Sequence, residues 1–315
     1  MQLVRKLDNY RADSKGIVLT IGNFDGLHLG HQEILKQLLK VSHDKNLLSA
    51  VMCFEPQPLE FFNRNETPAR LSRFRDKFLG FEKFGIDLLF CLNFNKSLAN
   101  MSPNDFIVKI LIEKLNVKQV IVGDDFHFGA SGIGNFNMLC EYGKKYNFNA
   151  ISLDSFIHNS CRISSTKIRK LLRCDELDHV ANLIGEPFFI RGKVSHGQEL
   201  GRKIDFPTAN INLKRRVAPV NGVYAVTVLL PNGSVKNGMA NVGTRPTVNG
   251  VEPKLEVYIL NFNGELYRQE IKVSFIKKIR AEKKFSSLVQ LKEQLQLDEA
   301  YARKLFMQLE NKCGI

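Results

Sequence analysis

GNFDGLHLGHQEIL occupies residues 22–35 and lies between an apolar run, IVLTIG, and a stretch with helical periodicity. Its glycines, Gly22 first among them, allow the backbone to approach a ligand closely, and the helix start offers unpaired N–H groups and a positive dipole. His28 and His31 lie there and can donate hydrogen bonds to the phosphates of ATP, stabilising charge on the α-phosphate and on departing pyrophosphate. The alternative is a glycine-rich turn with two surface histidines, which the strand–loop–helix context disfavours.

Strands and helices alternate in the first half of the chain. Near-continuous apolar runs are typical of buried parallel strands, and the segments between them repeat apolar residues with helical spacing. The expected strands are residues 17–22, 47–56, 87–94, 118–125 and 149–154, and the expected helices are 31–44, 70–85, 102–116 and 135–147. This alternation predicts an α/β doubly wound parallel sheet covered by helices on both faces.

Short strands separated by turns replace this pattern after Phe188. The expected strands are residues 188–197, 208–213, 223–233, 235–243, 255–264 and 270–280. Asn232-Gly233 and Asn263-Gly264 are predicted to form hairpin turns. Consecutive strands without intervening helices predict a small antiparallel β-barrel. Two closing helices are expected, at residues 286–296 and 298–312, the second with Asp298 as its N-cap.

The change of pattern predicts two domains, residues 1–185 and 186–315. A length of 315 residues and a hydrophobic content of 44% suit two globular domains with separate cores. No apolar run is long enough to span a bilayer, the first residues do not resemble a signal peptide, and the 6 cysteines form no CxxC motif. We therefore expect a cytoplasmic protein with reduced cysteines and no membrane partner.

The net charge of +13 raises the alternative of a nucleic-acid-binding protein. The basic residues are spread through the expected strands and loops, and the chain has neither a long basic arm nor an aromatic-rich RNA motif. A nucleic-acid-binding protein would lose affinity steeply with salt. The distribution instead favours a solvated basic surface that attracts nucleotide phosphates, without a nucleic-acid partner.

A second candidate nucleotide-binding segment is ISSTKIRKLL, residues 163–172. Ser164, Ser165 and Thr166 can cap a helix whose first turn contains Arg169 and a lysine. Cations in a first turn oppose the helix dipole, so a bound anion would account for them. A plain N-cap without a ligand is the alternative.

The second half has its own candidate site in RGKVSHGQELGRKIDFPTANINL, residues 191–213. A phosphate-compatible loop is predicted from three glycines, Gly192, Gly197 and Gly201. The Walker A pattern is absent. Thr208 and Asn210 alternate onto one side of a strand, so a hydroxyl and an amide oxygen converge. Such neutral oxygens, with ATP phosphates, are what Mg²⁺ accepts. The alternative is that both side chains bond nearby backbone.

Glu256 is a lone acid in the apolar run LEVYILNF. A desolvated carboxylate beside a primary hydroxyl is a credible general base for phosphoryl transfer. The alternative is a glutamate on an edge strand that faces water.

These segments together resemble, in order and over nearly the whole chain, the family of bacterial bifunctional riboflavin kinase/FAD synthetases. HxGH and the SSTxIR-like segment resemble the nucleotidylyltransferase superfamily, whereas FPTAN, NVGTRPT, LEVY and IRAEKKF resemble the riboflavin kinase module. The resemblance implies that His28, His31 and Glu256 are catalytic. It implies ATP-binding roles for Gly22, Phe24, Asp25, His28, His31, Ser164, Ser165, Thr166, Arg169, Gly192, Gly197, Gly201, Thr208 and Asn210, the last two also holding Mg²⁺.

Other segments resemble the flavin side of the two sites. CFEPQPLEFF (53–62), VGDDFHFGASGIGN (122–135) and IRAEKKF (279–285) match family segments. The resemblance implies flavin contacts from Asp125, Phe126, Phe128, Arg280 and Glu282. The chain departs from the usual family residues at Gln57, His127, Asp205, Tyr258 and Arg268, where His, Arg, Gly, His and Gly are usual.

The resemblance implies two reactions. The C-terminal half would phosphorylate riboflavin with ATP to give FMN, and the N-terminal half would adenylylate FMN with ATP to give FAD and pyrophosphate. Its partners would be ATP, riboflavin and FMN, and we expect a monomer or weak homo-oligomer that releases FMN into solution. A single-activity transferase of the same superfamily, for example one acting on pantetheine phosphate, would lack the second half's motifs.

Overall fold

The computed structural model describes residues 1–63, 67–153, 157–158, 161–197, 201, 204–213, 217–247 and 250–313. The chain forms two compact units, Met1–Ser165 and Thr166–Ile315. This division lies before the boundary expected at residue 185. Part of the expected glycine-rich loop, residues 198–200 and 202–203, lies outside the described residues.

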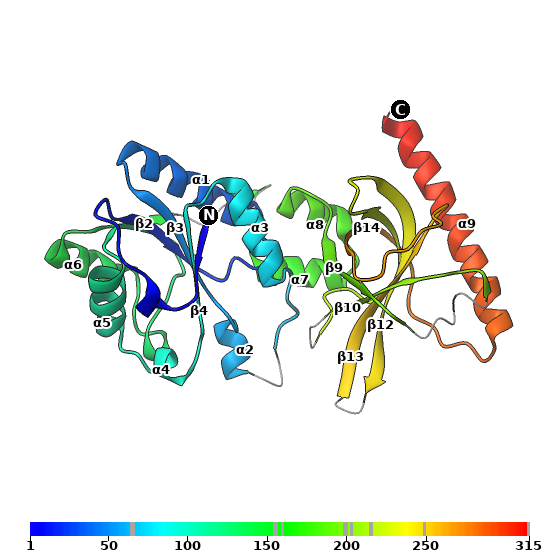
Figure 1. Ribbon diagram of the computed structural model, residues 1–315, viewed down its shortest axis with the longest axis horizontal. Helices are drawn as coiled ribbons and strands as arrows, with labels where there is room; N and C mark the ends of the chain where they lie inside the picture. Colours follow the sequence, from blue (N-terminus) through cyan, green and yellow to red (C-terminus); the bar gives the residue numbers. More distant parts are fainter. Residues whose placement is uncertain are drawn as a thin grey trace. The chain divides into compact units, whose positions relative to one another are not determined.

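The first unit contains the predicted parallel sheet (Figure 1). Its strands are β1 (Gln2–Val4), β2 (Ile17–Ile21), β3 (Leu48–Phe54), β4 (Leu88–Leu92), β5 (Val117–Gly123) and β6 (Asn149–Leu153), in the order β1-β4-β3-β2-β5-β6. All the paired neighbours are parallel. The strand order reverses direction at β2, so the carboxyl ends of β2 and β5 form the position where doubly wound sheets bind ligands. Three-residue β1 is too short to show a strand pattern and was not expected.

Helices cover both faces of this sheet, as the apolar strands predict (Figure 1). α1 (Leu29–Asp44) and α3 (Phe74–Phe84) bury Leu35, Leu38 and Phe81 with Val18 of β2 on one face. The π-helical segment η2 (Phe106–Lys114), which follows α5 (Pro103–Asp105), and α6 (Phe136–Tyr146) pack with Leu19 on the other. The shorter elements are η1 (Leu7–Asn9), α2 (Pro58–Phe62), α4 (Lys96–Ala99), η3 (Ala130–Gly132), β7 (Ile157–His158) and β8 (Cys161–Arg162).

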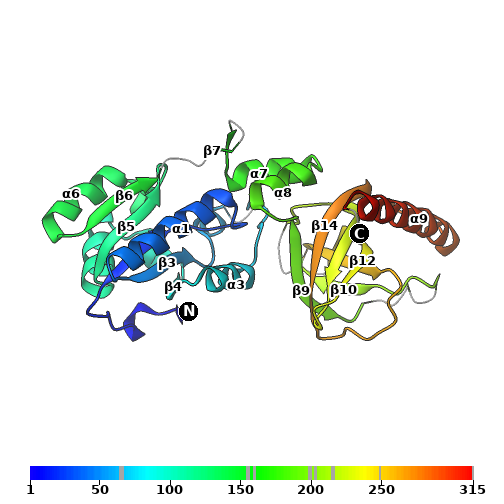
Figure 2. The same ribbon diagram turned by 90° about the horizontal axis from the view of Figure 1, so that it is seen from above.

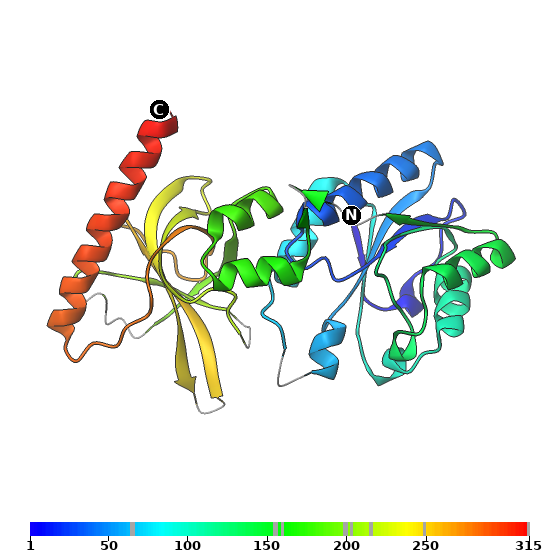
Figure 3. The ribbon, with the colours of Figure 1, turned by 180° about the vertical axis from the view of Figure 1, so that it is seen from behind.

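The second unit contains the predicted barrel. β9 (Phe189–Ser195), β10 (Ala209–Asn212), β11 (Gly222–Leu229), β12 (Val235–Thr247), β13 (Gly250–Ile259) and β14 (Glu270–Arg280) close in the order β10-β13-β12-β11-β14-β9. α7 (Ser165–Arg173) and α8 (Leu177–Ile184) precede it, and α8 packs against β14 (Figure 3). Between these helices, Asp175 accepts hydrogen bonds from the Tyr224 hydroxyl at 2.8 Å and from the Lys278 ammonium at 2.7 Å. The segment before residue 186 is therefore bonded to the barrel.

One predicted hairpin turn is confirmed and the other is wrong. Asn232-Gly233 connects β11 to its antiparallel neighbour β12, with Gly233 at a φ of 83°. Asn263-Gly264 lies in a longer connection, because β13 pairs with β10 and β12 whereas β14 pairs with β11 and β9. The alternating pattern cannot show which strands are neighbours, and closure of the barrel separates this pair.

The chain ends in a single helix, α9 (Leu288–Cys313), so the prediction of two helices is wrong (Figure 2). Asp298 lies inside this helix and is only 2% exposed. Its carboxylate accepts hydrogen bonds from Nε of Arg280 at 3.0 Å. An ion pair therefore holds Asp298 where a cap was expected. Ala302 and Phe306 of α9 pack in the cluster that contains Phe206.

Candidate active sites

The loop between β2 and α1 adopts a strained backbone. Gly26 has a φ of 87°, and Phe24 and Leu27 have φ values of 48° and 41°, in the left-handed region that side chains disfavour. The Asp25 carboxylate, 2% exposed, accepts N–H groups of Leu71 at 3.1 Å and of Ser72 at 2.9 Å. These bonds hold the loop in its conformation, so Asp25 shapes the site.

Phe24 is a core residue of this loop rather than a surface one. It is 2% exposed, and its ring packs edge-on against Phe81 at 5.4 Å and beside His31 at 5.1 Å between centroids. The Phe24 ring thus packs against the His31 ring and helps to fix its position. Direct contacts of Phe24 and Asp25 with ATP stay predictions.

His28 and His31 are brought together as the spacing predicts. Their rings stack at 3.6 Å between centroids, and Nδ1 of His28, the N-cap of α1, accepts the backbone N–H of His31 at 3.3 Å. An accepting Nδ1 leaves Nε2 to hold the proton of the neutral His28 ring.

His31 is electrostatically unusual. Burial, reinforced by the charges of His28 and Lys77, lowers the pKa of His31 well below its ordinary 6.5. Its Nδ1 is buried and has no hydrogen-bond partner among the described residues. A neutral imidazole with an unmatched buried nitrogen suits a site that receives a polar ligand, since buried polar atoms are otherwise almost always paired.

A buried charge network that sequence reasoning missed lies behind this loop. Lys77 of α3, fully buried, donates to Glu55 at 3.0 Å and to the Asn23 carbonyl at 3.3 Å. Arg70 pairs with Glu55 at 2.8 Å and also with Glu60. Burial raises the pKa of Glu60, but hydrogen bonds and charge from Arg70 outweigh this and lower it. The available signal was a lysine within the aromatic face of RFRDKFLGFEKF.

The start of α7 is joined to the histidine loop. The Ser165 hydroxyl donates to the Asp25 carbonyl at 2.9 Å. Ser164 immediately precedes this helix, and Thr166 and Arg169 lie on it. Their ATP contacts stay predictions.

The residues expected on the flavin side of the first unit have mixed surroundings. Phe126 and Phe128 stack at 5.6 Å, and Phe128 is 7% exposed within the core. Asp125 forms an exposed ion pair with Arg162 at 2.6 Å, and its carbonyl lies 2.9 Å from Nδ1 of His127. The Phe128 ring therefore has a packing role in addition to any flavin contact.

Gln57, the departure in the FEPQP segment, is buried. Its side chain is 6% exposed, and its Nε2 has no hydrogen-bond partner within the described part of the chain. Its backbone N–H donates to Glu60 at 3.0 Å. Gln57 therefore offers an unmatched donor beside the charge network.

In the barrel, Asn210 of β10 lies directly opposite Glu256 of β13. Asn210 is 6% exposed, and its Nδ2 donates to the Thr208 carbonyl at 3.2 Å. Its Oδ1 is buried without a partner among the residues described. Glu256 accepts from Lys254 at 2.9 Å, and its side chain is 39% exposed, less desolvated than expected.

Two of the three predicted loop glycines lie in close contact with other parts of the barrel unit, Gly197 with a side chain and Gly201 with the backbone. A Cβ on Gly197 would lie 2.3 Å from Nδ2 of Asn210, and one on Gly201 would lie 2.1 Å from the Phe206 carbonyl. Gly192 lies inside β9, paired with Ile271, so its expected place in the loop is wrong. The strand pairing between β9 and β14 includes Gly192, so the loop begins later in the chain than the glycine spacing indicates.

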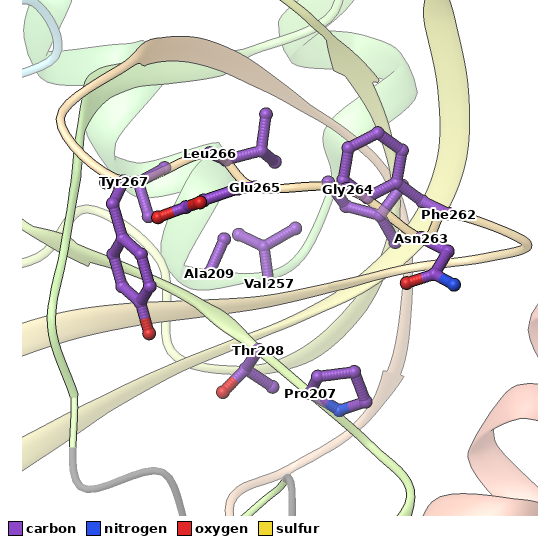
Figure 4. Close-up of a pocket in the computed structure, with 12 residues that line it drawn as sticks. Pro207, Thr208, Ala209, Val257, Phe262, Asn263, Gly264, Glu265, Leu266 and Tyr267 are labelled. Carbon is purple, nitrogen blue, oxygen red and sulfur yellow. The ribbon is translucent and has the colours of Figure 1, made fainter.

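A cavity of about 500 Å³ opens beside this strand. Thr208 lines it together with the segment 262–267 that connects β13 to β14. Figure 4 shows the rings of Tyr267 and Phe262 at opposite sides of the cavity, with Thr208 between them. Tyr267 also stacks on His196 at 3.9 Å between centroids. Sequence reasoning missed this segment, because it was interpreted as a hairpin turn.

The departures and the expected flavin residues of the barrel also have clear positions. Arg280 is engaged by Asp298, and the Glu282 carboxylate lies against Gly243, whose Cβ would be 2.0 Å from Oε1. Asp205 and Arg268 have φ values of 65° and 63°. Glycine is the cheapest residue in this conformation, which accounts for its being usual at both positions in the family. Tyr258 packs against Phe206 at 5.0 Å between ring centroids.

No group of three or more His, Cys, Asp or Glu side chains could hold a metal ion in the part of the chain that the structure covers. Within that same part, no helix is long and apolar enough to cross a membrane.

A parallel sheet with a histidine pair at its switch point and a closed barrel with an Asn–Glu pair together define a two-unit, nucleotide-dependent transferase. Residues 10–167 match the FAD synthetase family and residues 184–306 match the riboflavin kinase family. The chain is 46% identical to the bifunctional riboflavin kinase/FMN adenylyltransferase of Escherichia coli (strain K12), covering 97% of this chain and 98% of that protein. The Haemophilus influenzae relative of the same name is 45% identical, with 97% and 99% covered.

A solved structure described as a macrolide-efflux protein from Streptococcus pneumoniae superposes with a TM-score of 0.80 at 28% identity, covering 96% of this chain and 98% of that one. The chain belongs to the family of bifunctional riboflavin kinase/FMN adenylyltransferases. It phosphorylates riboflavin to FMN and adenylylates FMN to FAD, with ATP as co-substrate of both reactions.

Proposed function

We propose that the two reactions use two separate sets of residues, and that the catalytic residues divide at the boundary between residues 1–185 and 186–315. The HxGH loop and the start of α7 serve adenylyl transfer, and the Asn210–Glu256 pair serves the kinase. The observation on which this rests is the register of the barrel, in which the buried amide oxygen of Asn210, without a hydrogen-bond partner among the described residues, belongs to a side chain directly opposite Glu256 of β13.

In adenylyl transfer, the FMN phosphate attacks the α-phosphate of ATP in line, and pyrophosphate leaves without a covalent enzyme intermediate. His28 and His31 donate hydrogen bonds to the phosphates as charge develops. His31 does this as a neutral ring, as its lowered pKa requires. The stacked geometry, with His28 bonded to the backbone of His31, holds both donors in place before the substrates arrive.

We assign the remaining nucleotide and flavin contacts of this unit on the family resemblance and on position. Ser164, Ser165, Thr166 and Arg169 contact ATP, and Ser165 is already bonded to the histidine loop. Asp125, Phe126 and Phe128 contact the flavin, and the stacked pair of phenylalanines offers an aromatic surface for it.

In the kinase reaction, Glu256 accepts the proton of the ribityl 5′-hydroxyl as that oxygen attacks the γ-phosphate of ATP. Thr208 and Asn210 would hold Mg²⁺, and the unmatched Oδ1 of Asn210 is the oxygen ligand that this hard cation prefers. Bound there, the ion supplies charge neutralisation at the phosphates. The ATP base and sugar occupy the cavity beside Thr208. The rings of Phe262 and Tyr267, which line this cavity, offer stacking surfaces. Arg280 and Glu282 form part of the cover over the flavin.

The wider setting follows from the same chemistry. ATP, riboflavin and FMN are the partners, and neither nucleic acid nor membrane is needed for either reaction. We propose a cytoplasmic location, where ATP is supplied, and a monomer or weak homo-oligomer.

Glu256→Gln tests the kinase assignment. The substitution keeps the size of the side chain and removes the base, so riboflavin phosphorylation should fall about 10²–10⁴-fold. Conversion of supplied FMN to FAD, measured on the same preparation, should be unchanged. A variant that phosphorylates riboflavin at the wild-type rate would show that Glu256 is a surface glutamate, and Glu282 would be the next acid to test.

A further inference from the structure

Three polar side chains form a row across neighbouring strands of the barrel. Glu256 of β13 is in register with Asn210 of β10 on one side and with Asn241 of β12 on the other. Side chains directly opposite in antiparallel strands point to the same face and lie about 5 Å apart at Cβ. Asn241 is therefore a direct cross-strand neighbour of the proposed base, as Asn210 is.

Burial confirms that Asn241 and Glu256 share a face. Ala240 and Val242, on either side of Asn241, are 1% and 0% exposed, and the residues flanking Glu256, Leu255 and Val257, are both fully buried. Because side chains alternate along a strand, Asn241 and Glu256 point away from this apolar layer. The face that they share also receives the Glu282 carboxylate, which lies against Gly243 two residues along β12.

Asn241 has an unmatched acceptor. Its Oδ1 is buried and has no hydrogen-bond partner among the described residues, a property that it shares with Asn210. Buried polar atoms in native proteins nearly always have a partner, so two unmatched amide oxygens on either side of one carboxylate point to a ligand. The amide oxygen of Asn210 is accounted for by the proposed cation, whereas that of Asn241 is not.

The chemistry of the row selects the ligand. Amide and carboxylate oxygens accept hydrogen bonds, so they suit a chain of hydroxyl donors and disfavour phosphate, whose oxygens also accept. Neighbouring strands lie about 4.8 Å apart. This spacing is similar to the separation between the terminal hydroxyl of a polyol chain and a hydroxyl a few carbons before it.

We propose that Asn241 is a substrate-binding residue of the kinase site, whose Oδ1 accepts a hydrogen bond from an inner hydroxyl of the ribityl chain. This contact holds the chain along the row, so that its terminal hydroxyl reaches Glu256. The inference rests on the proposed role of Glu256 in the barrel.

Equilibrium binding of two flavins to the full-length protein tests the contact. Riboflavin has the polyol chain, whereas lumiflavin has the ring system without it. Asn241→Leu should weaken riboflavin about tenfold, the effect of one hydrogen bond, and leave lumiflavin unchanged. Asn237→Leu, on the same strand but opposite Leu260, is the matched control and should bind both flavins as the wild type does. Unchanged riboflavin affinity, or an equal loss for both flavins, would overturn the proposal.

Failure of the base assignment itself is distinguishable, since Glu256→Gln would then keep its rate while Asn241→Leu still weakened riboflavin binding.

Discussion

Lys77→Met tests whether the buried charge network supports the adenylyl-transfer site. Methionine nearly matches the length of lysine, so the change removes the charge and its hydrogen bonds to Glu55 and the Asn23 carbonyl while keeping most of the packing. Removing one partner of a buried ion pair typically costs about 3–5 kcal/mol. Glu55 keeps Arg70 at 2.8 Å, so we expect the lower end, about 3 kcal/mol, for the first unit.

Amide hydrogen exchange measures this loss in each unit separately. A loss of about 3 kcal/mol corresponds to roughly a hundredfold faster exchange of the most protected amides, those of β2 and β3, while β11 and β12 of the barrel should be unaffected. Lys83→Met, on the same helix but exposed, is the control and should exchange as the wild type does. FMN-to-FAD conversion should fall with Lys77→Met, whereas riboflavin phosphorylation should not.

The same variant should change the pH dependence of stability. The folded protein resists protonation of His31, whose pKa is lowered by burial, by His28 and by Lys77, whereas the unfolded chain takes up that proton near the ordinary 6.5. Stability from this group is therefore complete above about pH 6.5 and declines as the pH falls below it. Without Lys77 the decline should be smaller. Wild-type exchange rates in Lys77→Met, or equal effects of Lys77→Met and Lys83→Met, would refute the reasoning.

Three further predictions concern the histidine site, the extent of the barrel unit and the departures from the family. His31→Ala should reduce FAD formation about 10²–10³-fold and leave FMN formation near wild type in paired assays, because the histidine belongs to one unit alone; equal losses in both would contradict the separation of the sites. A fragment beginning at Thr166 should melt about 10 °C higher than one beginning at Glu186, although both should phosphorylate riboflavin. The shorter fragment lacks α8 and the two hydrogen bonds that Asp175 accepts from the barrel. Equal melting temperatures would show that residues 166–185 do not stabilise the barrel. Arg268→Gly should raise the free energy of unfolding by about 0.5–1 kcal/mol in urea titrations by relieving a φ of 63°, and Asp205→Gly by less, because it also loses an exposed ion pair; a destabilised Arg268→Gly would contradict the assignment of backbone strain.

Chemistry that is local in the chain could be predicted. The HxGH loop lies within a few residues of a strand and a helix, so its histidines had to meet, and they do. A strand was likewise predicted at Asn210, and β10 (Ala209–Asn212) forms there, although Thr208 lies just before it. The convergence of Thr208 and Asn210 on a cation stays a prediction. Chemistry that depends on distant segments could not be predicted. Lys77 contacts Glu55 and Asn23. Neither partner lies in α3, so the sequence of this helix does not indicate these contacts.

The sequence by itself determined the two fold classes, the order of the motifs and which residues are candidates for catalysis. Hydrophobic periodicity and glycine spacing are short-range properties, and they decide whether a segment becomes a strand, a helix or a loop. Only the tertiary structure decided which strands are neighbours. Closure of the barrel places β13 between β10 and β12, so that Glu256 lies between Asn210 and Asn241, and it turns an expected hairpin into the wall of a cavity. Strand pairing depends on the burial of both partners at once, and no single segment contains that information.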